Sequence, residues 1–352
     1  MDGPVAPSPV PSVESRERLL TLVRGYRISQ AIYVVTRLGI PDLLADGPRE
    51  VDGLAHATGS HPSSLRRVLR FLAAVGVLDK VGPDRLALTP VAAALRTGVP
   101  GSLRPTVLLL LDESHWRPWG HLFHTVRTGE TAFDHVFGMG TFDYFARHPE
   151  AAAIFNEAMT EGTRWAAPAV IAAYDFARFQ TIVDVGGGNG TLLAAILAAT
   201  PGLRGTVFDL AMGVAGARRH LEAAGVADRC QVVEGDFFVQ PLPSGADAYL
   251  LKSVIHDWDD ERSVAILENC RRAMPAHGKL LLVEPVLPAS VLRSEAHQRM
   301  VMSDLNMLAV AGGRERTEAE FRALLRSAGF GLTAVAPAAA PSIYSVIEGV
   351  PK

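Results

Sequence analysis

The segment "IVDVGGGNGTLL" (residues 182–193) decides the fold. A run of strand-forming residues ends in a turn that contains Gly186, Gly188 and Gly190, and an apolar, helix-forming run follows. Glycine lets the backbone turn sharply and approach a ligand without a Cβ in the way. The pattern predicts a strand, a tight turn and a helix. The turn would lie at the carboxyl end of the strand, where open α/β sheets bind ligands, and a turn without a ligand is the alternative.

The same alternation of strand and helix continues to the C-terminus. Strands are predicted in "QTIVDV", "RGTVFDL", "CQVVEGD", "DAYLLKSV" and "KLLLVEP", and helices in "GTLLAAILAAT", "GVAGARRHLEAAG", "DERSVAILENCRRAM" and "TEAEFRALLRSAG". Near-continuous apolar strands that alternate with helices indicate a mostly parallel sheet covered on both faces. The last two strands, "GLTAVAP" and "SIYSVIEG", have no helix between them and predict an antiparallel edge hairpin. We therefore expect an α/β domain with a seven-stranded sheet over residues 176–352.

Residues 15–100 predict a separate helical domain with a winged-helix outline. The helical periodicity of "RERLLTLVRGYRISQAIYVVTRLGIPDLL" gives an apolar surface wider than a small domain usually needs, which indicates burial against a partner. The segment "HPSSLRRVLRFLAAVG" predicts a helix with Ser63 or Ser64 as its N-cap and Gly76 as its C-cap. A hairpin is predicted in "VLDKVGPDRLALTP", with its tip at residues 82–84.

Two further segments complete the organisation of the chain. Residues 101–175 predict linking helices rich in aromatic side chains. Most of these rings are expected to pack in the core, and a minority to line a pocket for a flat substrate. Residues 1–14 contain four prolines and no apolar core, which predicts a disordered tail. This tail has the character of neither a signal peptide nor a membrane helix.

Composition limits the classes of partner. The 352 residues carry a formal net charge of −3, which gives no general attraction to nucleic acid or to anionic membranes. A winged helix invites a DNA-binding interpretation, but residues 50–96 hold six basic against four acidic side chains, a thin excess for phosphate binding. The two cysteines exclude a disulfide scaffold and a CxxC zinc cluster. We expect a cytoplasmic protein with no membrane span, no nucleic-acid partner and no metal.

The glycine spacing indicates which ligand the turn holds. The dinucleotide fingerprint G-x-G-x-x-G would need a third glycine at position 191, which is Thr191. Asp184 lies two residues before Gly186, where a carboxylate would repel a pyrophosphate and attract a cationic group. S-adenosylmethionine carries an ammonium and a sulfonium group, together with ribose hydroxyls and an adenine amine. This ligand therefore fits the turn better than a dinucleotide does.

Acidic residues also end the next two predicted strands. A carboxylate at Asp209 could accept hydrogen bonds from both ribose hydroxyls, and Asp236 could accept one from the adenine amine, with Phe237 against the ring. Asp209 alone would suit the ribose of NAD equally well, so a dehydrogenase is an alternative. Three acids at three successive strand ends favour S-adenosylmethionine.

The segment "LLKSVIHDWDDE" (residues 250–261) places His256 after the fourth strand, at the same predicted sheet edge as the glycine turn. Asp259, Asp260 and Glu261 begin the next predicted helix. We interpret these three acids as helix caps and not as catalysts, since carboxylates in a first turn complement the helix dipole. The role of Asp257 is left open.

Together these motifs resemble the class I S-adenosylmethionine-dependent O-methyltransferases, of the dimeric small-molecule type found in plant phenolic metabolism and bacterial natural-product pathways. The resemblance covers residues from about 15 to 350 and rests on "DVGGGNG", "VFDL", "GDFF", "LKSVIHDWDDE", "LLLVEPVLP" and "GGRERTEAEF", in that order. "FNEAM" and "RTGETAFDHVFG" match the linking helices of the family. The resemblance implies a Rossmann-like catalytic domain, a winged-helix dimerisation domain and a homodimer.

The resemblance also implies roles for individual residues. His256 resembles the general base, and Glu284 and Glu315 resemble the carboxylates that flank it. Met159 and Met307 resemble the methionines that enclose the acceptor ring. A cofactor-binding role is implied for eight positions: Asp184, Gly186, Gly188, Asp209, Asp236, Phe237, Lys252 and Trp258.

A histidine base suits methyl transfer to a phenol, whose pKa is near 10. We expect the neutral imidazole to take the proton as attack proceeds, with Glu284 holding its N–H. "TEAE" (residues 317–320) forms a capping box that does not account for Glu315. The expected function is O-methylation of a small hydroxylated aromatic metabolite. N- or C-methylation, or chemistry other than methyl transfer, is the alternative, and the identity of the acceptor stays open.

Overall fold

The computed structural model describes residues 10–352, which divide into two compact units between Asp112 and Glu113. Most of the predicted disordered tail, residues 1–9, lies outside the described residues. The first helix begins at Val13, inside the segment predicted to be tail. The boundary between the units falls within the predicted linking segment, since α6 (Arg104–Leu111) belongs to the N-terminal unit and α7 (Glu113–Gly120) to the C-terminal one.

The N-terminal unit has the predicted winged-helix outline. Its other helices are α1 (Val13–Arg37), α2 (Ile40–Leu43), α3 (Val51–Thr58), α4 (Pro62–Ala74) and α5 (Pro90–Ala93). The wing is the antiparallel pair β2 (Leu78–Lys80) and β3 (Arg85–Leu88), and β1 (Arg49–Glu50) pairs with the other edge of β3. A core of aliphatic side chains joins α1, α3 and α4 to this small sheet.

The N-cap of α4 differs from the prediction. The N-cap of α4 is His61, whose Nδ1 accepts a hydrogen bond from the backbone N–H of Ser64, and the predicted cap at Ser63 or Ser64 is wrong. Pro62 explains the difference, because proline favours the first helical position.

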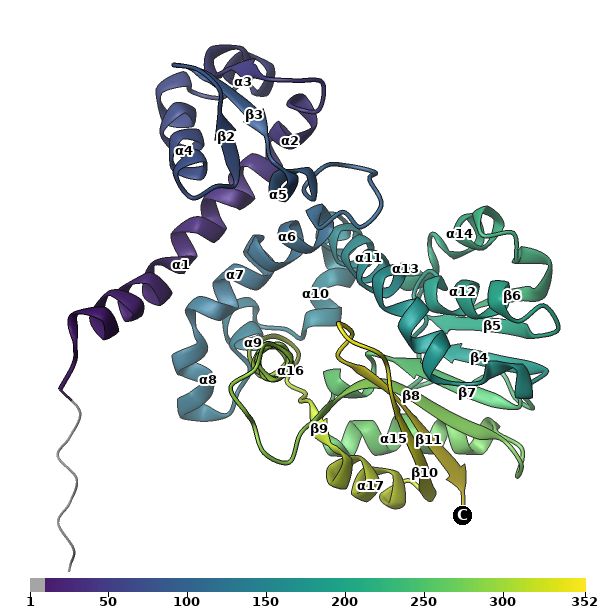
Figure 1. Ribbon diagram of the computed structural model, residues 1–352. Helices are drawn as coiled ribbons and strands as arrows, with labels where there is room; N and C mark the ends of the chain where they lie inside the picture. Colours follow the sequence, from purple (N-terminus) through teal and green to yellow (C-terminus); the bar gives the residue numbers. More distant parts are fainter. Residues whose placement is uncertain (1–9) are drawn as a thin grey trace, which may run out of the picture. The chain divides into compact units, whose positions relative to one another are not determined.

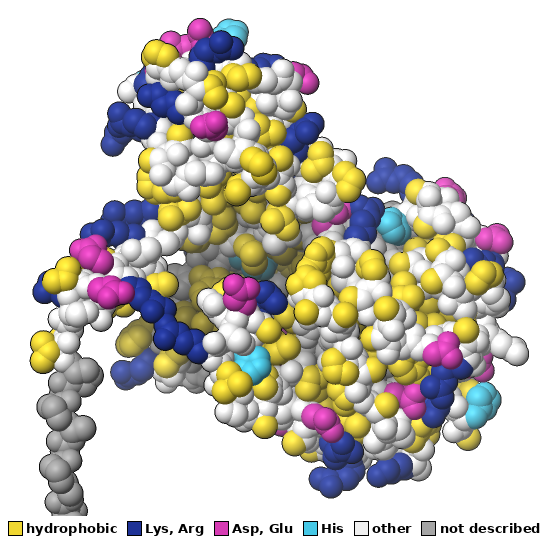
Figure 2. Space-filling model, viewed as in Figure 1, with side chains coloured by type: hydrophobic (Ala, Val, Ile, Leu, Met, Phe, Trp, Pro, Cys, Tyr) yellow, Lys and Arg dark blue, Asp and Glu magenta, His cyan; other side chains and the backbone are white. Residues whose placement is uncertain are grey.

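On α1, Leu19, Leu22 and Val23 are 61–69% exposed, and Figure 2 shows hydrophobic side chains gathered on the surface of this unit.

The C-terminal unit is built on the predicted sheet. Its seven principal strands are β4 (Thr181–Val185), β5 (Arg204–Asp209), β6 (Cys230–Glu234), β7 (Ala248–Lys252), β8 (Lys279–Leu287), β10 (Phe330–Pro337) and β11 (Tyr344–Pro351). They lie in the order β10-β11-β8-β7-β4-β5-β6, with β4 to β8 parallel and the last hairpin antiparallel. The sequence did not predict the two-residue strand β9 (Arg316–Thr317), which pairs with the end of β8.

Helices cover both faces of this sheet (Figure 1). One face packs against α11 (Pro149–Ala173), α12 (Thr191–Ala199) and α14 (Ala217–Ala223), and the other against α15 (Asp260–Ala273) and α17 (Glu318–Ser327). Side chains of β8 alternate between the two cores, with Leu280 and Leu282 in one and Leu281 and Val283 in the other. This period of two places both faces of the strand in apolar surroundings, as near-continuous apolar strands require.

The remaining helices and helical turns of this unit lie in the connections between these elements. They are α8 (Leu122–Thr128), α9 (Ala132–Phe137), α10 (Thr141–Arg147), α13 (Ala211–Val214), α16 (Glu295–Asn306), the 3-10 turns η1 (Phe176–Arg178), η2 (Ala227–Arg229) and η3 (Ile255–Asp257), and the π-helical turn η4 (Met307–Ala311). The helix predicted over residues 213–225 is wrong in extent, because α13 ends before Gly216 and α14 begins after it. Glycine disfavours a helix interior, which accounts for the break.

The sheet order places the glycine turn at a topological switch point. β4 lies between β5 and β7, so the chain leaves β4 in one direction and later returns to its other side. In open α/β sheets the crevice at such a point binds the ligand. Among residues 10–352, no helix is both long and apolar enough to cross a bilayer.

Candidate active site

The glycine turn after β4 is closely packed. Gly186 has φ +71°, and a Cβ there would lie 2.7 Å from a methyl group of Val254. Its backbone N–H donates to the carbonyl of Phe208 on β5 at 2.8 Å. The N–H of Gly188, at φ +57°, donates to Oδ2 of Asp209 at 2.7 Å. A side chain at Gly186 would meet both backbone strain and a clash, so glycine is required there.

Two carboxylates, Asp184 and Asp209, lie beside this turn. Burial raises the pKa of Asp184 to about 7, and the charge of Asp209 adds to the rise while Lys252 opposes it. Burial also raises the pKa of Asp209, against hydrogen bonds from the N–H groups of Gly188 and Leu210. Within residues 10–352, neither carboxylate forms an ion pair with a basic side chain. Such a pair of acids suits a ligand that carries positive charge. A cationic ligand is also what the sequence predicted for this cofactor site.

Aromatic rings surround the next strand end. Asp236 follows β6, and its Oδ1 accepts from the N–H of Phe238 at 2.8 Å. Phe237 and Phe238 both meet Trp258 edge to face, with centroids 6.3 and 4.8 Å away. Phe142, on α10, stacks on Trp258 at 5.4 Å. The structure therefore brings three predicted cofactor residues together and adds two rings, Phe238 and Phe142, that the sequence analysis had not assigned to the site.

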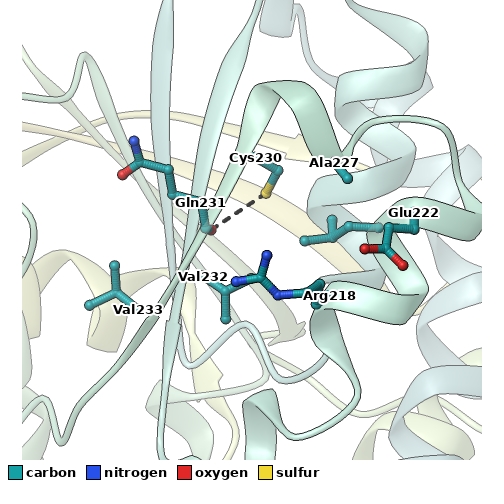
Figure 3. Close-up of a pocket in the computed structure, with 8 residues that line it drawn as sticks. Arg218, Glu222, Ala227, Cys230, Gln231, Val232 and Val233 are labelled. Carbon is teal, nitrogen blue, oxygen red and sulfur yellow. Dashed lines mark hydrogen bonds between the residues drawn. The ribbon is translucent and has the colours of Figure 1, made fainter.

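A separate hollow lies along the edge strand β6. It has a volume of about 340 Å³ and is lined by Arg218, Leu221, Glu222, Ala227, Cys230, Gln231, Val232 and Val233 (Figure 3). None of the predicted site residues lines it. Burial raises the pKa of the Cys230 thiol to about 12, so this cysteine is not activated as a nucleophile. The candidate active site is therefore the cluster at the carboxyl ends of the strands and not this hollow.

His256 lies in η3, directly after β7, and is only 9% exposed. Its Nδ1 is 2.9 Å from Oε1 of Glu315, a hydrogen bond, and 3.7 Å from Oε2 of Glu284. Its Nε2 is 3.7 Å from Oδ1 of Asp257. The sequence predicts that Glu284 holds the imidazole N–H, but the structure gives this hydrogen bond to Glu315, which lies in the loop between η4 and β9.

Glu284 and Glu315 hold this arrangement in different ways. Oε1 of Glu284 accepts from the N–H groups of Val254 and Ile255, at 3.0 and 2.9 Å, and so fixes the turn that bears His256. Oε1 of Glu315 also accepts from the hydroxyl of Ser303 at 2.7 Å. Both glutamates are almost fully buried. The histidine is therefore oriented by side chains from two later segments of the chain.

The protonation of this cluster follows from its charges. Burial by itself would lower the pKa of His256, but the carboxylates of Glu284, Glu315 and Asp257 raise it well above its ordinary value. Burial raises the pKa of Glu284 to about 7 and that of Asp257 to about 6, although the charge of His256 opposes both. The cluster therefore holds protons near neutral pH, and the imidazole carries one of them in the free protein.

Two residues that the sequence analysis missed hold the backbone of η3. The guanidinium of Arg316 is fully buried and donates to the carbonyls of Ile255 and Trp258, on either side of His256, at 3.0 and 2.9 Å. A Cβ on Gly313 would lie 2.0 Å from the carbonyl oxygen of His256. Both residues belong to the "GGRERT" segment. Their position beside Glu315 was the only feature of the sequence that pointed to a role in the site.

Lys252, at the end of β7, is held by another residue that the sequence analysis missed. Its Nζ lies 3.4 Å from the hydroxyl of Tyr344 and 4.7 Å from the centre of that ring. Ser253 has φ +53°, unusual for a residue other than glycine, and its hydroxyl is 3.1 Å from that of Tyr344. Strained backbone of this kind clusters at functional sites.

The two predicted substrate methionines lie on different elements. Met307 is buried at the start of η4, which contacts η3. Met159 is 40% exposed on α11, beside Thr160, whose hydroxyl accepts a hydrogen bond from Asn189 in the glycine turn at 2.8 Å. Each methionine is thus next to an element of the site, and their contact with an acceptor stays a prediction.

Comparison with known proteins fits this geometry. A sequence model of the O-methyltransferase domain matches residues 119–331, and one of the O-methyltransferase dimerisation domain matches residues 20–98. The chain belongs to the O-methyltransferase family. Among its relatives, this O-methyltransferase is 46% identical to the phenazine O-methyltransferase PhzM of Lysobacter antibioticus, over 95% of each chain.

Solved structures of similar enzymes agree with the family assignment. The crystal structure of LaPhzM superposes with a TM-score of 0.91 at 45% identity, over 96% of this chain and 99% of that one. A structure of the O-methyltransferase NcsB1 from neocarzinostatin biosynthesis, in complex with S-adenosylmethionine and 2-hydroxy-5-methyl naphthoic acid, superposes with a TM-score of 0.79 at 34% identity, over 92% and 96% of the two chains. This O-methyltransferase therefore uses S-adenosylmethionine, as the glycine spacing and the buried acids predicted.

Proposed function

We propose that the enzyme methylates a hydroxyl group of a small aromatic metabolite, with His256 as the general base. The observation that carries the base assignment is the 2.9 Å hydrogen bond from His256 Nδ1 to the buried Glu315. It fixes the tautomer with hydrogen on Nδ1, so the lone pair of the neutral ring lies on Nε2. Once the ring has lost the extra proton that it carries in the free protein, a buried imidazole oriented in this way is suited to accept a proton.

The residues of the chain act on the hydroxyl during transfer. Nε2 of His256 takes the phenolic proton while the oxygen forms its bond to the methyl carbon, and the bond from that carbon to sulfur breaks. When bound, S-adenosylmethionine supplies the electrophilic methyl group and a positive charge that disfavours an imidazolium nearby. General-base assistance of this kind contributes about 10²–10⁴ in rate. The carboxylate of Glu315 stabilises the imidazolium formed after proton transfer.

The residues at the strand ends would hold the methyl donor by charge and shape. Within residues 10–352 the acids Asp184 and Asp209 form no ion pair at contact distance, although the charge of Lys252 acts on Asp184, which supports a cationic ligand beside the glycine turn. Because Gly186 has no side chain in its closely packed position, its backbone atoms can face the ligand directly. For adenine recognition, support comes from Asp236 and from the rings of Phe237 and Trp258, which lie together. We assign Lys252 to the same site, beside Asp184.

A flat acceptor is supported by the aromatic and sulfur-containing side chains near η3. Phe142 stacks on Trp258, and Met307 is buried on the turn that contacts η3. The NcsB1 structure contains 2-hydroxy-5-methyl naphthoic acid, a flat hydroxylated aromatic molecule. We propose that Met159 and Met307 contact the acceptor ring, since methionine packs against rings of varied shape.

We further propose that the N-terminal unit associates with a second copy of the chain and not with DNA. The exposed apolar residues of α1 and the match to a dimerisation domain support a homodimer. Arg66, on the helix that would enter DNA, is instead paired with Asp52 at 2.7 Å and with Asp84. We expect the enzyme to act in the cytoplasm, where Cys230 and Cys270 remain free thiols.

The test is a search for the methylated product. The purified enzyme is incubated with methyl-labelled S-adenosylmethionine and a panel of hydroxylated aromatic metabolites, and products are analysed by mass spectrometry and NMR. We expect label on oxygen in at least one acceptor. Matched amino analogues separate O- from N-methylation, and label found only on nitrogen or carbon would contradict the proposal. Label transfer that His256→Gln retains at the full rate would contradict the base assignment alone.

A further inference from the structure

We propose that the C-terminal unit carries a surface binding site for a divalent transition-metal ion, with Zn²⁺ as the best-suited ion, formed by His124, Glu130 and His135. This site is separate from the residues assigned to methyl transfer, and the inference does not depend on the proposed function. One ring nitrogen or carboxylate oxygen from each of the three residues lies within 4.8 Å of the others.

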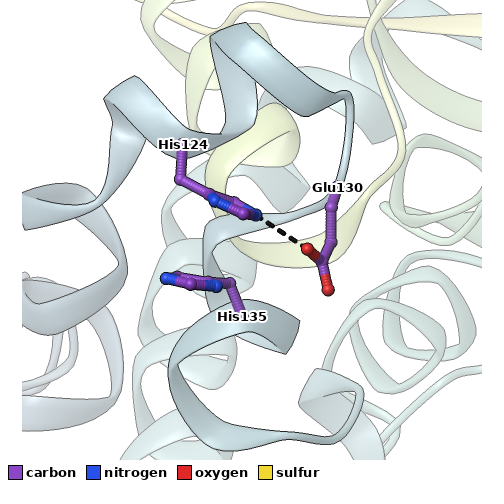
Figure 4. A group of neighbouring side chains, drawn as sticks. All are labelled: His124, Glu130 and His135. Carbon is purple, nitrogen blue, oxygen red and sulfur yellow. Dashed lines mark hydrogen bonds and ion pairs between the residues drawn. The ribbon is translucent and has the colours of Figure 1, made fainter.

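The three ligands come from a short and well-defined connection. His124 lies on α8, Glu130 in the loop, and His135 on α9 (Figure 4). The helix α8 ends at Thr128, and its C-cap Gly129 has φ +80° and donates its N–H to the carbonyl of Thr125 at 2.8 Å. Thr131 then caps α9 by accepting from the N–H of Asp134 at 3.1 Å. Backbone structure on both sides of Glu130 is therefore fixed by local hydrogen bonds, and only side chains need to move on binding.

The side chains are already gathered on one side of this loop. Nε2 of His124 is 2.7 Å from Oε2 of Glu130. The rings of His124 and His135 are stacked, with centroids 3.7 Å apart and planes 15° from parallel. The side chain of His135 makes no hydrogen bond within the described part of the chain, so nothing there competes for its ring nitrogens. A simple ion pair between His124 and Glu130 does not explain why a second imidazole lies on the first.

The donor set selects the class of ion. Two neutral imidazoles and one carboxylate bind Zn²⁺ well and leave a fourth position for water. In a tetrahedral zinc site the ligand atoms lie roughly 3.3 Å apart, given metal–ligand distances of about 2.0–2.2 Å. Glu130 and His135 are exposed, so rotation of their side chains can close the gap from 4.8 Å. Hard cations such as Mg²⁺ prefer oxygen ligands and are not expected to bind.

An ion at this position would join α8 to α9. Both helices also contact η4, the turn that begins with the buried Met307. Binding would therefore tie together the helices that pack against η4 and slow their local opening.

The test measures metal binding directly. The full-length enzyme is freed of any affinity tag and treated with chelator, and Zn²⁺ and Co²⁺ are then titrated by calorimetry and by visible absorption of Co²⁺. We expect one equivalent to bind with a Kd of about 10 µM or tighter at pH 7.5. The variants His124→Ala and His135→Ala should each lose more than about 100-fold in affinity, since loss of even an outer-shell partner costs 10–100-fold.

Two controls make the result specific. His277→Ala removes another exposed histidine, which lies 3.4 Å from a carboxylate oxygen of Asp247 but has no second imidazole, and it should leave binding unchanged. His256→Gln alters the buried His256–Glu284–Glu315 cluster, whose atoms also lie within 4.8 Å, and it should likewise leave binding unchanged. In the wild type, Zn²⁺ should slow amide hydrogen exchange in α8 and α9. Absence of binding at 100 µM metal, or binding that survives His135→Ala, would overturn the proposal.

Discussion

Two groups of acidic side chains lie at the same edge of the sheet, and they differ in what balances their charge. Asp184 and Asp209 flank the glycine turn with no basic side chain of residues 10–352 in ion-pair contact, and burial raises the pKa of both. Glu284 and Glu315 instead surround His256, which lies 3.7 and 2.9 Å from them. The negative charge of Asp184 and Asp209 is left for a ligand to balance. The charge of Glu284 and Glu315 is balanced by the imidazole of His256, which can take up a proton.

Under the proposed function, this difference assigns binding of the methyl donor to one group and proton transfer to the other. A carboxylate that the fold leaves unpaired gains most from a cationic ligand, so the first group favours binding of the charged methyl donor. A carboxylate that is hydrogen-bonded to an imidazole instead sets the basicity and orientation of that ring. Substitutions in one group should therefore change binding and stability, while substitutions in the other should change turnover.

The largest expected effect comes from His256→Gln. Glutamine keeps a polar side chain in the cluster but cannot accept the phenolic proton, so kcat should fall by about 10²–10⁴. Binding of S-adenosylmethionine, measured by calorimetry, should stay close to that of the wild type. Wild-type turnover in this variant would show that the second group is not catalytic.

Replacement of Arg316 by methionine should produce the next largest effect. The fully buried guanidinium holds the carbonyls of Ile255 and Trp258, and without it these acceptors are unsatisfied. We expect a loss of about 3 kcal/mol in the free energy of unfolding, measured by urea denaturation. Arg322→Met, which removes an exposed pair with Glu318, should cost less than about 0.5 kcal/mol.

Arg316→Lys tests whether this residue positions the base as well as stabilising the fold. Lysine keeps the charge but cannot donate to several acceptors in the fixed geometry of a guanidinium. We expect kcat to fall while KM for the methyl donor changes little. Equal changes in both constants would indicate a structural role only.

Asp184→Asn separates binding from stability in the first group. The pKa of Asp184 is about 7 in the folded protein and near 3.9 in an unfolded chain, so the folded state binds more protons between these values. The carboxylate therefore lowers stability as the pH rises from about 4 through 7. At pH 8 the asparagine variant without ligand should gain on the order of 2 kcal/mol and bind the methyl donor more weakly.

The sign of this effect can be checked at a second aspartate. Burial would raise the pKa of Asp247, but hydrogen bonds from Gln180 and Thr181 lower it. Its stabilising contribution is present above the unfolded pKa, near 3.9, and is lost as the pH falls through the folded value. Asp247→Asn should therefore destabilise the protein at pH 8, opposite to Asp184→Asn, and the same sign in both variants would refute the charge argument.

The smallest expected effect is a shift of the pH profile in Glu284→Gln. Glutamine can still accept from the N–H groups of Val254 and Ile255, but it no longer raises the pKa of His256 by its charge. The base loses its proton more easily, so the acidic limb of the kcat/KM profile should move to lower pH. Glu318→Gln, on the exposed face of α17, should not move it.

Local sequence patterns predicted most of the fold. The period of the apolar residues identified the seven principal strands, and the glycine turn, the capping box at Thr317 and the N-cap at Asp259 follow from short-range hydrogen bonding. These features depend on residues only a few positions apart. The failures at His61 and Gly216 were also local, since a proline and a glycine outweighed the preferred cap and helix.

The sequence by itself determined which chemical groups end each strand, because strand ends can be located from periodicity. Only the tertiary structure decided which of them meet. Glu315 is 59 residues from His256 and yet makes its hydrogen bond, and Arg316 reaches the same turn from β9. The gathering of His124 and His135 beside Glu130 likewise depends on how α9 packs beside α8. Such contacts are set by the return path of the chain and by burial, which no short stretch of residues encodes.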